Sequence, residues 1–137
     1  MTTAVDTNVL LDIWLNEKGR AEAALDAIEL VAQAGRLIVS DIVYAELCGH
    51  FTHQGDCDRF LRDAEILVEP LNEESCFLAS RIWIQYRKQA GPRARILPDF
   101  LIGAHAQVQA SRLLSRDAGF FRKPFPRLAL VDPSRTA

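Results

Sequence analysis

Short apolar runs alternate along this sequence with longer stretches in which apolar residues recur every three or four positions. The short runs are typical of buried strands and the longer stretches of amphipathic helices. The short runs predict strands at Thr2–Val5, Arg36–Val39, Ile66–Val68, Leu113–Leu114 and Leu128–Val131. The longer stretches predict helices over about 9–14, 21–34, 42–47, 57–64, 73–90 and 98–110, and a Phe-rich helix or turn precedes the last strand.

Residues with strong local preferences mark several of these boundaries. Gly35 is suited to a left-handed helix stop, and Ser40 is suited to cap the helix that follows it. Asn72 predicts the start of the long helix, which we expect to stop at Gly91-Pro92, and Pro98 predicts the first turn of the next one.

Strands separated by helices predict a mostly parallel sheet, because parallel neighbours need crossover connections. We therefore expect an α/β fold, a three-layer α/β/α sandwich around four or five strands. A chain of 137 residues without repeat or linker indicates a single domain over residues 1–137.

Composition narrows the class of protein. Hydrophobic residues make up 49% and charged residues 25% of the chain, and no apolar run is long enough for a membrane span. The start MTTAVD lacks the features of a signal peptide, so we expect a cytoplasmic protein. Its three cysteines form no CxxC pair, and we expect free thiols rather than disulfides.

Charge is divided unevenly along the chain. Residues 1–80 carry 15 acidic and 5 basic residues, a net charge of −10, whereas residues 81–137 carry 3 acidic and 11 basic residues, a net charge of +8. The basic half indicates either a polyanionic partner or neutralisation of one half by the other within the fold. The densest basic stretch contains Arg87, Lys88, Arg93 and Arg95.

Four acidic residues follow the predicted strands or open the helices after them. They are Asp6 after the first strand, Glu46 in the helix after the second, Asp99 in the first turn after Pro98, and Asp117 after the fourth strand. Because strand ends and the helix starts that follow them share one edge of a parallel sheet, these carboxylates can gather there. Individually, they can also be read as turn residues or helix-start acids.

Gathered carboxylates repel one another unless they bind protons or a cation. Oxygen ligands without Cys or His favour Mg²⁺ or Mn²⁺ over zinc. Such a site can activate water and stabilise charge at a phosphate during displacement, which is nuclease chemistry.

Four motifs contain these acids, in the order AVDTNVLLDIW, SDIVYAEL, LPDFLIGAHA and LLSRDAGFF. In these motifs and their order the sequence resembles PIN-domain proteins, and specifically the VapC toxins of bacterial toxin–antitoxin pairs. The resemblance implies that Asp6, Glu46, Asp99 and Asp117 form the catalytic metal site, supported by Thr7, Asn8 and Ser115, the last standing where the family often has Thr.

The resemblance also implies an activity and partners. We expect an Mg²⁺- or Mn²⁺-dependent endoribonuclease, the toxin of a pair, inhibited by a VapB-like antitoxin and forming a homodimer. The predicted RNA-binding residues are Arg87, Lys88, Arg93, Arg95 and Arg116. Trp14 and Trp83 are candidates for exposed apolar surface at the protein interfaces.

Other residues suggest chemistry that we interpret more simply. Cys48, His50, His53 and Cys57 have the spacing of a zinc knuckle but are read as residues of a helix end and connection. Six residues after Asp99, His105 falls on another side of its helix and is a poor general base. Asp12 and Asp41 are read as a solvated helix acid and a first-turn acid, and Phe120, Phe121 and Phe125 as core rather than base-stacking residues.

Two other classes of function compete with the nuclease. A receiver or phosphatase-like domain also gathers acids at strand ends, but VDTNVL has no second acid after the first strand and no Lys ends a late strand. A non-catalytic PIN-like binding or regulatory module would keep the fold without the chemistry, and the four intact acids argue against it.

Overall fold

The computed structural model describes residues 1–89 and 95–135. Its sheet contains β1 (Thr2–Val5), β2 (Arg36–Val39), β3 (Ile66–Val68), β4 (Arg112–Leu114) and β5 (Leu130–Val131). The strands lie in the order β3-β2-β1-β4-β5, and every pair is parallel. The predicted α/β class and the upper strand number are confirmed.

Helices connect these strands. They are α1 (Thr7–Trp14), α2 (Ala21–Ala34), α3 (Asp41–Cys48), α4 (Gln54–Asp63), α5 (Glu73–Gln89), α6 (Leu97–Gln109) and α7 (Ala118–Phe121), followed by the 3-10 turn η1 (Pro133–Arg135). None of the helices in this described part of the chain combines the length and apolar character needed to cross a lipid bilayer.

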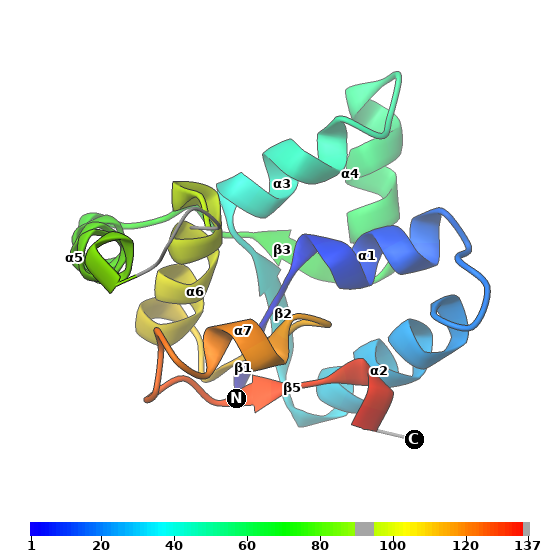
Figure 1. The fold of residues 1–137 in the computed structure, drawn as a ribbon. Helices are drawn as coiled ribbons and strands as arrows, with labels where there is room; N and C mark the ends of the chain where they lie inside the picture. Colours follow the sequence, from blue (N-terminus) through cyan, green and yellow to red (C-terminus); the bar gives the residue numbers. More distant parts are fainter. Residues whose placement is uncertain (90–94, 136–137) are drawn as a thin grey trace.

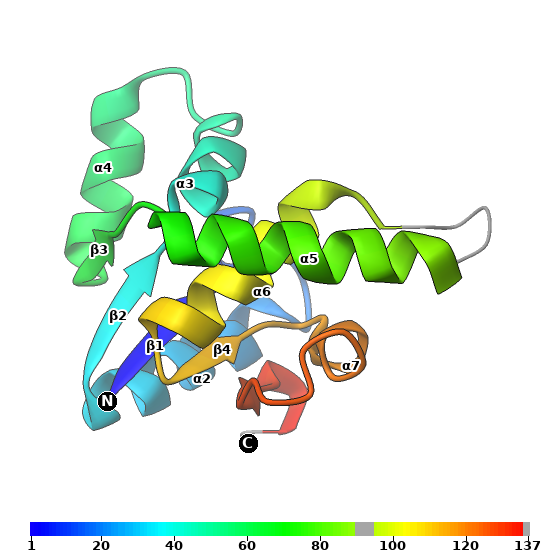
Figure 2. The same cartoon turned by 90° about the vertical axis from the view of Figure 1, so that its left-hand side faces the viewer.

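The helices form a layer on each side of the sheet. In Figure 1, α5 and α6 lie to the left of the strands, while α1 and α2 lie to the right. Figure 2 shows α5 crossing over α6, and contacts of α6 with β1 and β4 place it directly against the sheet. The expected three-layer sandwich is therefore the observed one.

Burial is greatest at the centre of the sheet, because both of its faces are covered. Strands β1, β2 and β4 each have buried side chains after their first residue, whereas the residues of the edge strand β5 are only half-buried. At Gly103 of α6, a Cβ atom would lie 2.5 Å from the ring of the fully buried Phe125. The chain therefore packs a glycine of this helix directly against an aromatic ring.

Local signals located most boundaries. Ser40 Oγ accepts a hydrogen bond from Val43 N (3.2 Å), and Asn72 Oδ1 accepts one from Ser75 N (2.8 Å), so both residues cap their helices as predicted. Gly35 ends α2, but with φ 155° and ψ −161° it does not adopt the expected left-handed αL conformation. Its missing side chain is needed for another reason, because a Cβ would lie 1.7 Å from the carbonyl oxygen of Met1.

Two predicted elements start elsewhere. The helix expected from Cys57 begins at Gln54. The apolar periodicity did not indicate this start, because the first turn of the helix is polar. The strand expected from Leu128 begins at Leu130, because Leu128 N donates to the carbonyl of Phe125 in a turn.

The topology creates one particular edge. From β1 the chain continues to β2 on one side, and β4 lies on the other, so the connections diverge where the carboxyl ends of β1 and β4 meet. Crevices at such switch points are where open α/β sheets bind their ligands. Val5 and Leu114 are register partners, which places Asp6 and Ser115 next to each other at this point.

Candidate active site

Asp6 is the buried acid at the centre of this edge. It has extended backbone angles at the N-cap of α1, and its Oδ1 accepts a hydrogen bond from Thr7 N at 2.7 Å. Its Oδ2 accepts one from Ser115 Oγ, also at 2.7 Å. Asp6 is therefore a helix-capping residue and also part of a polar cluster.

Ser115 joins the two strand ends. Its Oγ, besides donating to Asp6, accepts a hydrogen bond from Asp117 N at 2.9 Å. Asn8 Nδ2 lies 3.4 Å from Asp6 Oδ2 and 3.5 Å from Ser115 Oγ, and Asn8 Oδ1 accepts from Arg116 N at 3.1 Å. Residues separated by more than 100 positions are thus fixed to one another by polar side chains.

Glu46 reaches the cluster through Thr7. Thr7 Oγ1 donates to Glu46 Oε1 at 2.6 Å, which joins α3 to the first turn of α1. Because the main-chain N–H of Thr7 also bonds Asp6, this residue contacts both acids.

Arg95 is a cation that acts on the other two acids. Its Nη1 lies 3.3 Å from Asp117 Oδ2, and its guanidinium charge opposes the rise in the pKa of Asp99. Asp99 N bonds the carbonyl of Ile96 in the first turn of α6, where the sequence predicted it.

Burial and like charge act on the protonation of two of these carboxyls. Burial raises the pKa of Asp6 to about 6, with smaller contributions from the charges of Glu46 and Asp117, while bonds from Ser115 and Thr7 oppose the rise. The pKa of Asp99 is also raised, first by burial and then by the charges of Glu46 and Asp117. All four predicted acids therefore interact electrostatically at one edge of the sheet.

The donor chemistry fits a hard divalent cation. The four groups are all carboxylates, and Mg²⁺ and Mn²⁺ prefer oxygen ligands. Burial among like charges also favours binding a cation over leaving Asp6 and Asp99 ionised alone. Across residues 1–89 and 95–135, however, no three Asp, Glu, His or Cys side chains are already arranged to hold a metal ion.

The predicted RNA-binding residues have different surroundings. Arg87 and Lys88 are exposed at the end of α5, Arg95 contacts Asp117, and Arg93 lies outside the described residues. Arg116 binds the Asp12 carboxylate, with Nε–Oδ2 and Nη2–Oδ1 distances of 2.8 and 3.3 Å.

Sequence reasoning was wrong about Asp12. It was predicted to be solvated, but its exposed fraction is 4% and it is the partner of Arg116. Asp12 follows Asn8 by four positions, so the two lie on the same face of α1. That spacing was the available signal, since both side chains contact Arg116.

The other candidate groups have structural surroundings. His50 and His53 are exposed, the thiols of Cys48 and Cys57 are free with their sulfurs 3.7 Å apart, and burial raises the pKa of Cys57 to about 12. No zinc-knuckle arrangement is found in the described residues. His105 is buried, and its Nε2 lies 2.7 Å from the carbonyl oxygen of Glu69.

The aromatic residues predicted to lie in the core or at interfaces differ in burial. Phe121 and Phe125 are buried in the core as predicted, whereas Phe120 is only half-buried and lies beneath the guanidinium of Arg95. Trp14 is 43% exposed and Trp83 is half-buried, with the guanidinium of Arg87 over its ring.

Known structures share this fold. The chain is similar to VapBC-1 from nontypeable Haemophilus influenzae, with 25% identity, a TM-score of 0.74 and coverage of 98% of this chain and 100% of that one. It is also similar to VapBC2 from Rickettsia felis bound to a promoter DNA fragment (18% identity, TM-score 0.71, coverage 96% and 98%). A toxin-antitoxin complex from Klebsiella pneumoniae gives 23% identity, a TM-score of 0.68 and coverage of 96% and 97%.

The family model places the chain more directly. No curated protein matches it by sequence. The model of the PIN domain, however, matches residues 3–126, which include all four acids and their supporting polar residues. The chain belongs to the PIN-domain family.

Proposed function

We propose that this protein is a VapC-type toxin, an endoribonuclease that uses Mg²⁺ or Mn²⁺ held by Asp6, Glu46, Asp99 and Asp117. The observation that carries the proposal is the surroundings of Asp6, a buried carboxylate whose pKa is raised to about 6 beside the charges of Glu46 and Asp117. A merely structural cap does not need further acids around it, whereas a cation site does.

Each polar neighbour has a definite task in this proposal. Ser115 and Thr7 N hold the Asp6 carboxylate in one orientation, and Thr7 Oγ1 holds Glu46. Arg95, paired with Asp117, keeps positive charge beside the acids and is placed to contact an RNA phosphate. A bound Mg²⁺ or Mn²⁺ would supply activation of water and stabilisation of charge on the phosphate.

The similar structures support the proposed partners. The three neighbours described above are VapBC or toxin-antitoxin complexes, one of them bound to DNA. We infer that a VapB-like antitoxin binds this chain and inhibits it, that the toxin forms a homodimer, and that it acts on RNA in the cytoplasm. The family match leaves no support for a receiver or phosphatase-like domain.

The test is cleavage of a fluorescent single-stranded RNA by protein purified free of antitoxin. We expect cleavage with Mg²⁺ or Mn²⁺ and none in EDTA. Asp6→Asn, Asp99→Asn and Asp117→Asn should each lower the rate by about two orders of magnitude or more, as expected when charge stabilisation is lost from an active site. Asp63→Asn, at an exposed position of α4, is the matched control and should cleave normally.

Titration with Mn²⁺ separates this proposal from a non-catalytic module. The wild-type protein should release or absorb heat on binding Mn²⁺, and Asp99→Asn should reduce that heat. A protein that binds no Mn²⁺, or that cleaves RNA fully in EDTA, is not the proposed enzyme.

A further inference from the structure

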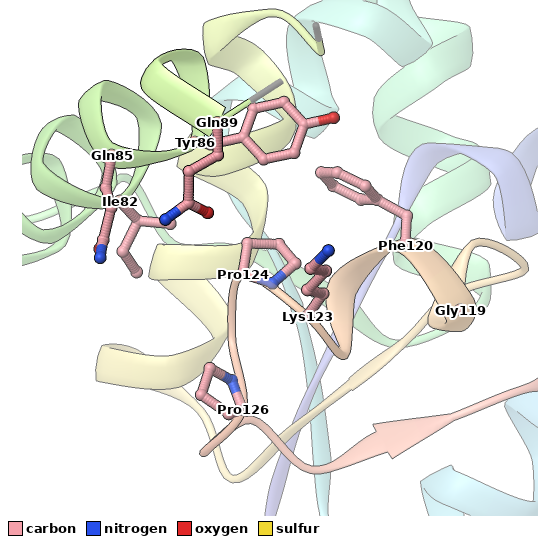
Figure 3. A pocket seen from close by; sticks show the side chains of 9 residues that line it. All are labelled: Ile82, Gln85, Tyr86, Gln89, Gly119, Phe120, Lys123, Pro124 and Pro126. Atoms are coloured by element: carbon pink, nitrogen blue, oxygen red, sulfur yellow. The ribbon is translucent and has the colours of Figure 1, made fainter. Parts of the chain in front are cut away.

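A pocket of about 550 Å³ lies between α5 and α7, on the side of the sheet that carries α6. Figure 3 shows the ring of Tyr86 and the ring of Phe120 at one end of it, with Lys123 and Pro124 below them. Gln85 and Gln89 line it from α5, and Gly119 from α7.

These groups combine three kinds of interaction. The two aromatic rings offer flat apolar surface, the two amide side chains both donate and accept hydrogen bonds, and Lys123 offers a positive charge. Among the described residues that line the pocket there is no carboxylate. An apolar ligand would form no hydrogen bonds with the two amides, and a cationic ligand would be repelled by Lys123.

The pocket adjoins the proposed metal site. Phe120 N donates a hydrogen bond to the carbonyl oxygen of Asp117 at 2.9 Å. Phe120 therefore lies one helical turn from that acid. The guanidinium of Arg95 lies 4.3 Å from the centre of the Phe120 ring and also pairs with Asp117 at 3.3 Å. A ligand that contacts the Phe120 ring is thereby connected to Asp117 through Phe120 and Arg95.

We propose that this pocket binds one unpaired nucleobase of the RNA substrate, next to the phosphate that is cleaved. The proposal rests on the function proposed above. Tyr86 and Phe120 provide aromatic surface for the base, Gln85 and Gln89 read its polar edge, and Lys123 contacts the adjoining phosphate. The pocket then selects where in an unpaired RNA segment the enzyme cuts.

Binding of single nucleotides in EDTA tests the pocket without requiring catalysis. We expect AMP, CMP, GMP or UMP to bind more tightly than ribose 5-phosphate, which lacks the base, in a calorimetric or NMR titration up to about 10 mM. Asp99→Asn protein should bind the same nucleotide as the wild type does. Loss of RNA cleavage in that variant therefore reports on the metal site, and nucleotide binding reports on the pocket.

Gly119→Leu is the variant that fills the pocket. A Cβ at Gly119 meets nothing within 4 Å and its φ is not positive, so the backbone accepts a side chain there, and Gly119 itself lines the pocket. We expect it to lower nucleotide affinity about tenfold or more, a typical effect of losing base–aromatic stacking. Gly55→Leu, at a glycine of α4 that also has open space around its Cβ, is the matched control and should leave affinity unchanged.

The two glutamines test recognition of the base. Gln85→Ala and Gln89→Ala should change the order of affinity among the four nucleotides and shift the cleavage positions mapped on a long RNA. Nucleotide binding that is undetectable, no stronger than that of ribose 5-phosphate, or unaffected by Gly119→Leu would overturn the proposal. So would displacement of the nucleotide by a polyglutamate peptide at equal concentration, which would assign the pocket to an acidic protein segment.

Discussion

The carboxylate of Asp6 is exposed to opposing influences. Two hydrogen bonds favour its ionised form, while burial and the neighbouring acids favour its neutral form, and burial is the stronger influence. In the metal-free protein, ionisation of this acid is therefore unfavourable, and a bound cation would make it favourable. The role expected from sequence and the local structural role are compatible, because the same side chain caps α1 and faces the other acids.

Asp6 should give the metal-free protein a distinct dependence of stability on pH. Its pKa rises from 3.8 to about 6 on folding, so the neutral form stabilises the fold fully below pH 4 and this stability is lost as the pH rises through 6. In EDTA, the unfolding free energy of Asp6→Asn relative to wild type should increase by up to about 3 kcal/mol across that range. Urea unfolding at several pH values measures it.

The comparison isolates Asp6, because all other carboxyls titrate in both proteins. A difference between the two proteins that stays constant from pH 4 to pH 7 would contradict the buried, raised pKa. Saturating Mn²⁺ at pH 7 should stabilise the wild type more than Asp6→Asn, since a ligand stabilises only the state that binds it.

The positions of the helices and central strands could be predicted from the sequence, because each of these elements carries its own local signal. Ser40 and Asn72 cap helices by bonds within three residues, and β1 and β2 are short runs rich in branched and small apolar residues, buried after their first residue. The short edge strand β5 could not be located as well, since its residues are only half-buried and a turn precedes it.

The packing of α6 against the segment after α7 has no such local signal in the sequence. A substitution at Gly103, which lies against Phe125 of that segment, tests this packing. In Gly103→Ala, the new Cβ would lie 2.5 Å from the Phe125 ring, which is held among Phe100 and Phe121 and has little room to move. We expect a loss of about 1–3 kcal/mol in unfolding free energy, as in other overpacked cores. Urea denaturation measures it.

Gly55→Ala is the control for this change. It replaces a helical glycine whose Cβ position is open, so it should leave stability unchanged or raise it by up to about 1 kcal/mol. Equal effects of the two substitutions would show that helix propensity, and not the contact with Phe125, decides the outcome.

Across the protein as a whole, the gathering of four acids at one edge of the sheet could be predicted from the sequence, but their contacts with other side chains could not. Their positions after strands follow from local pattern, whereas the Arg95–Asp117 and Arg116–Asp12 pairs depend on side chains brought together by tertiary structure. The same limit applies to the pocket between α5 and α7, whose lining comes from segments more than 25 residues apart.

The basic half of the chain leads to a prediction about RNA affinity. If Arg87 and Lys88 at the exposed end of α5 follow the RNA backbone, reversing both to Glu should weaken binding to all sequences alike. The slope of log affinity against log salt should become shallower by roughly 0.7 for each phosphate that the protein no longer neutralises. Fluorescence anisotropy in EDTA at four salt concentrations measures this slope.

Arg59 and Arg62, both exposed on α4, provide the control pair for charge reversal. Their reversal changes the net charge equally but lies in the acidic half of the chain, and should leave the slope nearly unchanged. If both pairs alter the slope by the same amount, overall charge rather than a defined RNA path governs binding.

The central place of β1 also governs when the proposed enzyme can first act during its synthesis. Of the five strands β1 is made before the others, yet one of its two neighbours, β4, is made more than 100 residues after it. Asp6 therefore meets Ser115 and Asp117 only after β4 has left the ribosome. A nascent chain that stops before β4 lacks both of these residues, so the site of the proposed ribonuclease cannot form until the fold closes.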